Sequence, residues 1–172
     1  CYSSLEDIQA AFVEFVNKVP FYGAAIVCAD DAPVRAILGR IERRTITYGT
    51  TPEADLAAAE VRCGHFASEF RLCFRGRDLG QFRLRSAGRH SVLNAMAAVL
   101  VGLELEVPVE TIREGLAGFS GVDRRFQVRG REAGVTVIDD YGHHPSEIRA
   151  TLAAARHCDF RRIHVLFQPH RY

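Results

Sequence analysis

The sequence predicts an α/β protein built from two incomplete domains. Short apolar strands alternate with amphipathic helices over residues 3–49, a rhythm typical of a parallel sheet. Apolar and polar side chains then alternate over residues 60–85, which indicates an antiparallel hairpin with one exposed face. A second strand-and-helix pattern follows Gly121. We therefore expect part of a mostly parallel sheet that carries an antiparallel hairpin, followed by the start of a second α/β domain.

The first domain is expected over residues 1–120, and its opening elements follow from capping and breaking residues. Ser3 and Glu6 have the spacing of a capping box, and Pro20 cannot continue a helix, so a helix should lie between these points. The apolar run at residues 23–29 predicts a short buried strand. Next should come a helix with Val34, Ile37 and Leu38 facing inward, and a strand at residues 44–48.

A hairpin and two helices should complete this domain. Phenylalanine and leucine residues alternate on both sides of Gly76–Gly80, so this segment is expected to be the turn of the hairpin. Apolar residues at helical spacing follow Gly88 and continue to Leu103. A second helix should begin near Pro108, because proline suits the first helical turn. The inner stripe of that helix should be Ile112, Leu116 and Phe119.

The second domain is expected over residues 121–172, after a glycine-bounded linker. Its last strand should be parallel to its second strand, which would bring the polar residues after both strands to one edge of the sheet. The chain begins and stops inside this alternating pattern, so we expect a fragment of a longer protein. The expected elements are strands at residues 126–129, 135–138 (buried) and 163–167, a turn at residues 132–134, and a helix from Pro145 to about His157.

The composition limits the classes of function. Apolar residues make up 48% of the 172 residues, which fits a globular protein. The 22 basic and 21 acidic residues almost cancel, so no basic surface for nucleic acid or an anionic membrane is expected. The five cysteines are odd in number and have no C-x-x-C spacing, which favours free thiols in the cytoplasm. No apolar run approaches the roughly 18 residues of a membrane span.

The most informative feature is the tract Asp139–Glu147, which gathers two aspartates, a phenol and two imidazoles between a predicted strand and a predicted helix. This position is the usual ligand crevice of open α/β sheets. An aspartate there can bind ribose hydroxyls, and Tyr141 and His143 can meet a substrate amine or carboxylate. Two other interpretations stay open: a capped helix start with polar decoration, and a zinc site, although adjacent histidines on a loop rarely face one ion. The zinc interpretation would use Asp139, Asp140, His143 and His144.

Two further segments carry polar groups suited to a nucleotide. At the loop-to-helix junction Gly88–Asn94, the amide of Asn94 offers a donor and an acceptor that match an adenine edge, or it is simply the polar shoulder of a capped core helix. Arg124 and Arg125 lie in the linker, where an arginine fork could hold a transferring phosphoryl group, or where the two form a solvated surface pair. The sequence contains no G-x-x-x-x-G-K-[ST] phosphate loop and no evident nucleophile triad.

Three motifs, in this order and spacing, closely resemble the Mur ligase family over essentially the whole chain. The motifs are Gly88-Arg89-His90-x-x-Leu93-Asn94-Ala95, Gly118-Phe119-Ser120-Gly121-Val122-x-Arg124-Arg125-Phe126, and Asp139-Asp140-Tyr141-Gly142-His143-His144-Pro145 with Phe167-Gln168-Pro169-His170-Arg171-Tyr172. The resemblance implies the latter part of a central ATPase-type domain (residues 1–120) and the opening of a Rossmann-like, amino-acid-binding C-terminal domain (residues 121–172).

The activity implied by the resemblance is ATP- and Mg²⁺-dependent ligation of L-alanine to UDP-N-acetylmuramic acid through an acyl phosphate, in cytoplasmic peptidoglycan synthesis. The pair Tyr141-Gly142 favours this branch over the related ligase that recycles murein tripeptide, which stays an alternative. A non-catalytic nucleotide-binding module is the other alternative, because the phosphate loop is missing from these residues. The magnesium ligands and the phosphate loop are expected outside the fragment, which should be inactive alone and could associate with itself through an open sheet edge after Phe167.

The resemblance also implies the role of each site residue. Asn94 would read the adenine edge in a pocket shaped by His90, and Ser91 stands where the family commonly has asparagine. Replacing that amide removes a two-point match, at a cost of about 0.5–1.5 kcal/mol for one neutral hydrogen bond. The implied ATP-binding residues are His90, Ser91, Asn94, Arg125 and Asp140; those around the alanine are Tyr141, His143, His170 and Arg171; Arg125 and His143 are the implied catalytic residues, with Asp139 and His144 in support.

Overall fold

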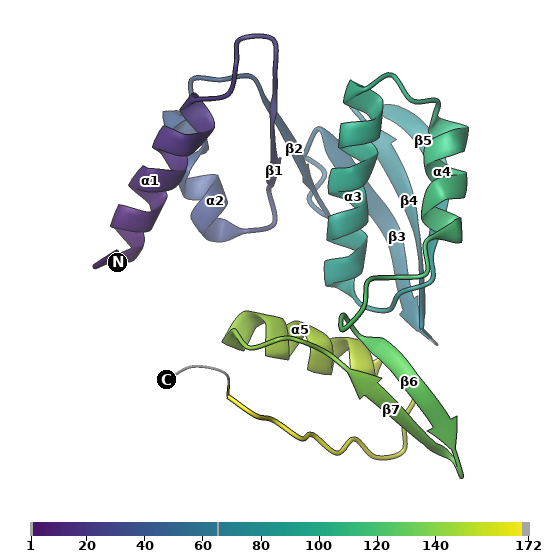
Figure 1. Cartoon of the computed structure of the whole chain (residues 1–172). Helices are drawn as coiled ribbons and strands as arrows, with labels where there is room; N and C mark the ends of the chain where they lie inside the picture. The colour runs from purple at the N-terminus through teal and green to yellow at the C-terminus, as the bar shows by residue number, and fades with distance from the viewer. Residues whose placement is uncertain (1, 65, 170–172) are drawn as a thin grey trace. The chain divides into compact units, whose positions relative to one another are not determined.

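A computed structural model describes residues 2–64 and 66–169 (Figure 1). The chain divides into two compact units, and each is described by itself. Unit 1 comprises Cys1–Ala59, Arg71–Gly80 and Leu93–Ile112, and unit 2 comprises Glu60–Phe70, Gln81–Val92 and Arg113–Tyr172. No helix among the described residues is long and apolar enough to cross a membrane.

A five-stranded sheet has the strand order β1-β2-β3-β4-β5. Strands β1 and β2 are parallel, with Ile26 opposite Ile46, and β2 and β3 are parallel where Tyr48 faces Leu56. The prediction of a mostly parallel sheet with an antiparallel hairpin is confirmed. The strands are β1 (Ala25–Cys28), β2 (Thr45–Gly49), β3 (Leu56–Gly64), β4 (Ala67–Phe74) and β5 (Arg77–Leu84).

The hairpin turn between β4 and β5 lies earlier than predicted. Its two central residues are Arg75 and Gly76, with φ of 49° and 81°, which is the left-handed pair that a two-residue primed turn requires. Gly80, expected in the turn, lies inside β5, where its N–H donates to Oδ1 of Asp78 at 2.9 Å. The prediction was wrong because the turn uses an arginine in a conformation that composition does not signal.

The helices of the first 120 residues lie where periodicity placed them, but their ends differ. The N-cap of α1 is Ser4, not Ser3: the Ser4 hydroxyl accepts from the N–H of Asp7 at 3.1 Å, and the Asp7 carboxylate accepts from the N–H of Ser3 at 3.1 Å. Phe119 is 48% exposed because α4 ends at Gly118, so its predicted place in the inner stripe is wrong. The helices are α1 (Leu5–Asn17), α2 (Ala32–Ile37), a 3₁₀ turn (Leu38–Arg40), α3 (Arg89–Glu104) and α4 (Val109–Gly118).

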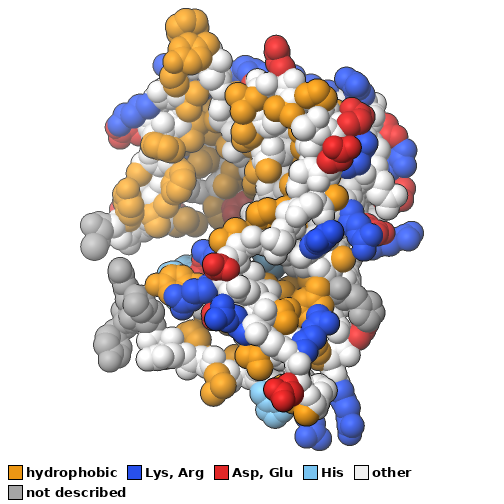
Figure 2. Space-filling model, turned by 45° about the vertical axis from the view of Figure 1, so that its right-hand side comes forward, with side chains coloured by type: hydrophobic (Ala, Val, Ile, Leu, Met, Phe, Trp, Pro, Cys, Tyr) orange, Lys and Arg blue, Asp and Glu red, His pale blue; other side chains and the backbone are white. Residues whose placement is uncertain are grey.

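Unit 1 carries an apolar surface. The residues of this surface lie on α1 and in the segment after it, and Figure 2 shows hydrophobic side chains gathered on this side of the molecule. Phe15 is 71% exposed and Phe21 is 89% exposed. Contiguous apolar surface of this kind is typical of an interaction face. The surface comprises Leu5, Ile8, Phe12, Phe15, Phe21 and Tyr22.

The strands β6 and β7 form a separate two-stranded antiparallel sheet. Ala133 and Gly134, with φ of 49° and 78°, make its two-residue turn, where the sequence predicted it. The prediction that the second strand is buried was wrong, because Val135 and Val137 are 62% and 55% exposed. The elements are β6 (Gln127–Glu132), β7 (Val135–Asp139) and α5 (Pro145–Arg156).

The last predicted strand is not formed. Residues 163–167 have no strand assignment, and Leu166 is fully exposed. An extended segment becomes a strand only by pairing, and among the described residues β7 is paired with β6 alone. The sheet edge expected after Phe167, and the crevice it was to share with the tract, therefore have no support. His170 and Arg171 lie outside the described residues.

Candidate functional site

A small hydrophobic core in unit 2 positions the candidate site. It brings together the segment just before α3, the linker residue before β6, the end of β7 and the C-terminal end of α5. Close packing of such a core fixes the backbone of the segments that contribute to it. The buried residues are Ala87, Phe126, Ala154, Ala155 and Cys158, and the side chains packed against them are Phe66, Ile138 and Phe160.

Gly88 allows α5 to approach the start of α3. Its φ is +97°, a left-handed conformation that glycine adopts without penalty. A Cβ atom at this position would lie 2.9 Å from the Cβ of Ala154 and 2.9 Å from Cε1 of His90. The first glycine of the Gly88–Asn94 segment is therefore required by both backbone conformation and space.

His90 follows in the first turn of α3 and is half-buried. Burial holds the pKa of His90 below its ordinary value of 6.5; the negative charge of Asp140 opposes this shift and the positive charge of Arg125 adds to it. The imidazole is therefore neutral at pH 7. Both Asp140 and Arg125 therefore lie within electrostatic reach of His90.

Ser91 and Asn94 differ in what they offer a ligand. The Ser91 hydroxyl donates to the carbonyl of Ala87 at 3.0 Å and lies 2.9 Å from the Ser86 hydroxyl and 3.3 Å from Nε2 of His90. The Ser91 hydroxyl therefore already has partners within the protein at the start of α3. Asn94 is exposed one helical turn after His90 on α3, so its amide is accessible.

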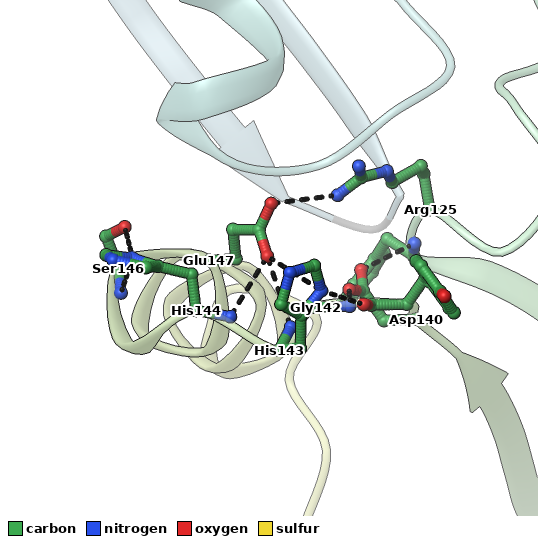
Figure 3. Close-up of polar contacts among 9 residues, drawn as sticks. Arg125, Asp140, Gly142, His143, His144, Ser146 and Glu147 are labelled. Atoms are coloured by element: carbon green, nitrogen blue, oxygen red, sulfur yellow. Dashed lines mark hydrogen bonds and ion pairs between the residues drawn. The ribbon is translucent and has the colours of Figure 1, made fainter. Parts of the chain in front are cut away.

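Asp140 connects the linker to the Asp139–Glu147 tract. One carboxylate oxygen accepts from the N–H of Phe126 at 2.9 Å, and the other accepts from the N–H of Gly142 at 2.7 Å (Figure 3). A Cβ at Gly142 would lie 2.8 Å from this second oxygen, so a larger residue there would displace the Asp140 carboxylate. Each carboxylate oxygen can accept more than one hydrogen bond, which leaves Asp140 able to accept hydroxyl groups as well.

The two linker arginines have different partners, so they do not form a fork. The guanidinium of Arg124 lies 4.4 Å from the centre of the Tyr141 ring, and its Nε is 3.7 Å from Asp139. The carbonyl of Arg124 accepts from the N–H of Tyr141 at 2.8 Å. Arg125 instead directs Nη1 toward Oε1 of Glu147 at 3.5 Å. Arg124 thereby holds the linker against the end of β7, and Arg125 is the arginine available to an anion.

The start of α5 is organised by Glu147. Its Oε2 accepts from the backbone N–H groups of His143 and His144, each at 3.1 Å, and His144 is the N-cap (Figure 3). Oxygens that accept backbone N–H groups favour the charged form of a carboxylate. The bonds from His144 and His143 are the main reason that the pKa of Glu147 falls to about 2 from its ordinary 4.5. The negative charge of Glu147 is therefore present at any physiological pH.

The two histidines of the tract point to different neighbours. The ring of His143 is 53% exposed and packs edge-on against Tyr141, with ring centres 5.8 Å apart. Nδ1 of His144 lies 2.6 Å from the hydroxyl of Ser146 and accepts from its N–H at 3.3 Å. Within residues 2–64 and 66–169 no group of three or more His, Cys, Asp or Glu side chains is arranged to hold a metal ion. The zinc interpretation therefore gains no support here.

A cavity of about 370 Å³ lies beside the linker in unit 2. Its charged lining residues are three arginines, Arg85, Arg125 and Arg131, and one aspartate, Asp123. This excess of positive charge suits an anionic group. Arg125 therefore both lines this cavity and contacts Glu147.

Sequence reasoning missed the role of Glu147, which it treated as polar decoration. The signal was present, because Glu147 lies three residues after His144, the spacing of a capping box. The pattern was not recognised because the N-cap is a histidine, whereas the usual capping residues are serine, threonine, aspartate and asparagine.

Two protein-family models and many known proteins are similar to this chain. A family model described as the Mur ligase middle domain matches residues 1–102, and one described as the Mur ligase, glutamate ligase domain matches residues 124–171. A curated relative, the UDP-N-acetylmuramate–L-alanine ligase of Solibacter usitatus (strain Ellin6076), is 68% identical over 99% of this chain and 36% of its own length. The chain thus spans little more than a third of that relative.

Solved structures give the same picture of the fold. The MurF crystal structure from Acinetobacter baumannii has a TM-score of 0.73 at 29% identity and covers 84% of this chain and 32% of its own. The MurF ligase of Thermotoga maritima, solved in complex with ADP, has a TM-score of 0.72 at 22% identity and covers 88% of this chain and 35% of its own.

Proposed function

Because the chain belongs to the Mur ligase family, we propose that it forms part of an ATP-dependent ligase that joins L-alanine to UDP-N-acetylmuramic acid in the cytoplasmic synthesis of peptidoglycan precursors. The observation that supports the proposal most is the hydrogen bond from the backbone N–H of Phe126 to Asp140, which holds this carboxylate next to the linker that carries Arg125. We propose that this carboxylate binds the ribose hydroxyls of ATP. The name of the 68% identical relative supports L-alanine as the amino acid.

The proposed chemistry solves the problem that a carboxylate is a poor acyl donor. The γ-phosphoryl group of ATP is transferred to the lactyl carboxylate, ADP leaves, and the resulting acyl phosphate has a good leaving group. The amine of alanine then attacks the acyl carbon, a tetrahedral intermediate forms, and phosphate departs as the amine loses a proton. The contribution of Arg125 is to stabilise charge on the transferring phosphoryl group.

The chemistry of the individual side chains suits a nucleotide. Asp140 keeps accepting capacity for the ribose, neutral His90 offers an apolar ring face with a polar edge, and Asn94 is accessible on α3. The ADP bound to the Thermotoga maritima MurF ligase is consistent with this role. We propose His90, Ser91, Asn94, Arg125 and Asp140 as the nucleotide site; since the Ser91 hydroxyl already has three partners, its contribution is to orient His90.

The proposed alanine site uses the exposed part of the tract. Tyr141 is 42% exposed and His143 lies against it, so both can contact a small zwitterion. We propose that Tyr141, His143, His170 and Arg171 bind the alanine, with the guanidinium of Arg171 suited to its carboxylate, and that His143 is also catalytic. Magnesium would neutralise the phosphates when bound, and we expect residues outside this fragment to supply its ligands.

The decisive test is a phosphate-release assay on the longest natural polypeptide that contains these 172 residues, supplied with ATP, Mg²⁺ and UDP-N-acetylmuramic acid. L-alanine should support turnover and murein tripeptide should not. Preference for the tripeptide would establish the recycling ligase, and no turnover with either would leave the non-catalytic nucleotide-binding module. The 172-residue chain alone should be inactive, and robust turnover by it would refute that expectation.

Two substitutions in the same polypeptide separate the proposed subsites. Asp140→Ala should raise the Michaelis constant for ATP more than that for alanine, because it removes the ribose acceptor. Arg171→Ala should raise the constant for alanine first. The opposite pattern in either variant would show that the residue was assigned to the wrong ligand.

The domain boundary at residues 120/121 and self-association of the chain also belong to the proposal. Limited proteolysis should cut first in the linker near Gly121, which is exposed. Self-association is supported by the apolar surface on α1 rather than by the expected sheet edge. Light scattering should detect oligomers that Phe15→Ser weakens; a monomer at all concentrations would contradict it.

A further inference from the structure

The carboxylate of Glu147 is the point at which three parts of the candidate site meet. Its Oε2 accepts from the backbone N–H groups of His143 and His144, each at 3.1 Å, and lies 3.7 Å from Nδ1 of His143. Its Oε1 lies 3.5 Å from Nη1 of Arg125 (Figure 3). One oxygen thus caps the helix, and the other faces the linker arginine.

These two tasks make different demands on the side chain. Capping needs only an oxygen that accepts hydrogen bonds, and glutamine supplies one at this position as well as glutamate does. Attracting Arg125 needs a negative charge. The two roles of Glu147 can therefore be separated by a substitution that removes the charge and keeps the oxygen.

We propose that Glu147 is a positioning residue whose negative charge holds the guanidinium of Arg125 at the start of α5 until a triphosphate displaces it. This inference rests on the proposed function, because it takes Arg125 to be a phosphate-binding residue. It assigns to Glu147 the resting-state partner of that arginine, a role distinct from capping α5.

The geometry of the pair suits exchange. A separation of 3.5 Å exceeds that of an ordinary N–H to oxygen hydrogen bond, and the two side chains are 55% and 34% exposed. Exposed pairs of this kind are weak. A triphosphate carries several negative charges and makes shorter, charge-assisted bonds to arginine, so it should take over the guanidinium. Until then the pair keeps a long, flexible side chain near the site.

The inference gives the direction in which Glu147→Gln changes nucleotide affinity. Removing the competing charge destabilises the nucleotide-free state, so the nucleotide should bind more tightly. A surface pair of this strength corresponds to a change in dissociation constant of about two- to fivefold. The change should shrink in high salt, since the pair is exposed and therefore screened.

The experiment is calorimetric titration of the longest natural polypeptide containing this chain with the nonhydrolysable analogue adenylyl imidodiphosphate. Glu147→Gln should lower the dissociation constant about two- to fivefold, and the same substitution in an Arg125→Ala background should have no such effect. Ser146→Ala is the matched control: it alters the helix start but leaves the charge of Glu147, and should leave the affinity unchanged.

Each outcome decides the matter. Unchanged or weaker binding by a folded Glu147→Gln protein, or the same tightening without Arg125, would overturn the inference and leave the proposed function intact. Failure of the unsubstituted protein to bind the analogue would overturn both. If Glu147→Gln does not fold, the side-chain N–H resonance of Arg125 in the unsubstituted protein serves instead: it should shift on adding the analogue, and a constant resonance overturns the exchange.

Discussion

Replacing Gly88 by alanine should destabilise the protein more than any other glycine-to-alanine change at a similar backbone angle. Gly121 provides the matched control, because its φ of +99° is almost that of Gly88 (+97°), yet a Cβ at Gly121 would meet no atom within 4 Å. Both substitutions place an alanine in a left-handed backbone conformation, which costs about 1–2 kcal/mol of stability. Only Gly88→Ala also places a Cβ 2.9 Å from the side chains of Ala154 and His90. Overpacking of a close-packed site adds about 1–3 kcal/mol.

These terms convert into a measurable difference in thermal unfolding. For a domain of this size, 1 kcal/mol shifts Tm by roughly 2–4 °C. Gly121→Ala should therefore lower Tm by about 2–8 °C, and Gly88→Ala by a further 2–12 °C or so, measured by circular dichroism. Adding Ala154→Gly to Gly88→Ala should recover part of the second loss, beyond the effect of each change alone. Equal losses for the two glycine variants would refute the close approach of α5 to the start of α3.

Three other predictions concern single side chains. Asp140→Asn should lower the pKa of His90 further, because the Asp140 charge raises it; an unchanged or higher value in an NMR titration would contradict the proximity of the two residues. The pKa of Glu147 is about 2 in the folded protein and ordinarily 4.5, so the ionised carboxylate stabilises the fold above about pH 4.5 and this stabilisation is lost as the pH falls toward 2. Glutamine does not ionise, so between pH 4.5 and 2 the Tm of Glu147→Gln should fall less than that of the unsubstituted protein. Phe82→Ala, at a fully buried ring stacked 6.0 Å from Phe70, should cost about 3–5 kcal/mol in urea unfolding, whereas Phe15→Ala, at an exposed ring, should change stability by less than about 0.5 kcal/mol.

Where the sequence analysis failed, the deciding interactions were local but chemically unexpected. The N-cap of α1 is Ser4 and not the expected Ser3, because the Ser4 hydroxyl accepts from the N–H of Asp7 while the Asp7 carboxylate accepts from the N–H of Ser3. The β4–β5 turn uses Arg75 in a left-handed conformation, where composition favoured the glycine-rich residues after it. In both cases the residues used lie within a few positions of those predicted.

The prediction that the strand at residues 135–138 is buried was wrong for a different reason. Val135 and Val137 have the apolar character of a buried strand, but burial requires a neighbouring layer, and in the described structure β7 has β6 as its only strand neighbour. An apolar pattern indicates that a segment can be buried, but it does not identify the element that would pack against it. The segment 163–167 is the same case, since strand formation needs a partner with free backbone groups.

Periodicity, glycine and proline positions and three spaced motifs were enough to predict the α/β class, most of the elements and the family, because these depend on local preferences that recur along the chain. The pairing of Arg125 with Glu147 and of Asp140 with the backbone of Phe126 was decided only in the folded chain. These contacts join residues that are 14 to 22 positions apart in the sequence. They form only when the chain packs around Phe126, and the spacing of residues in a sequence does not predict such packing.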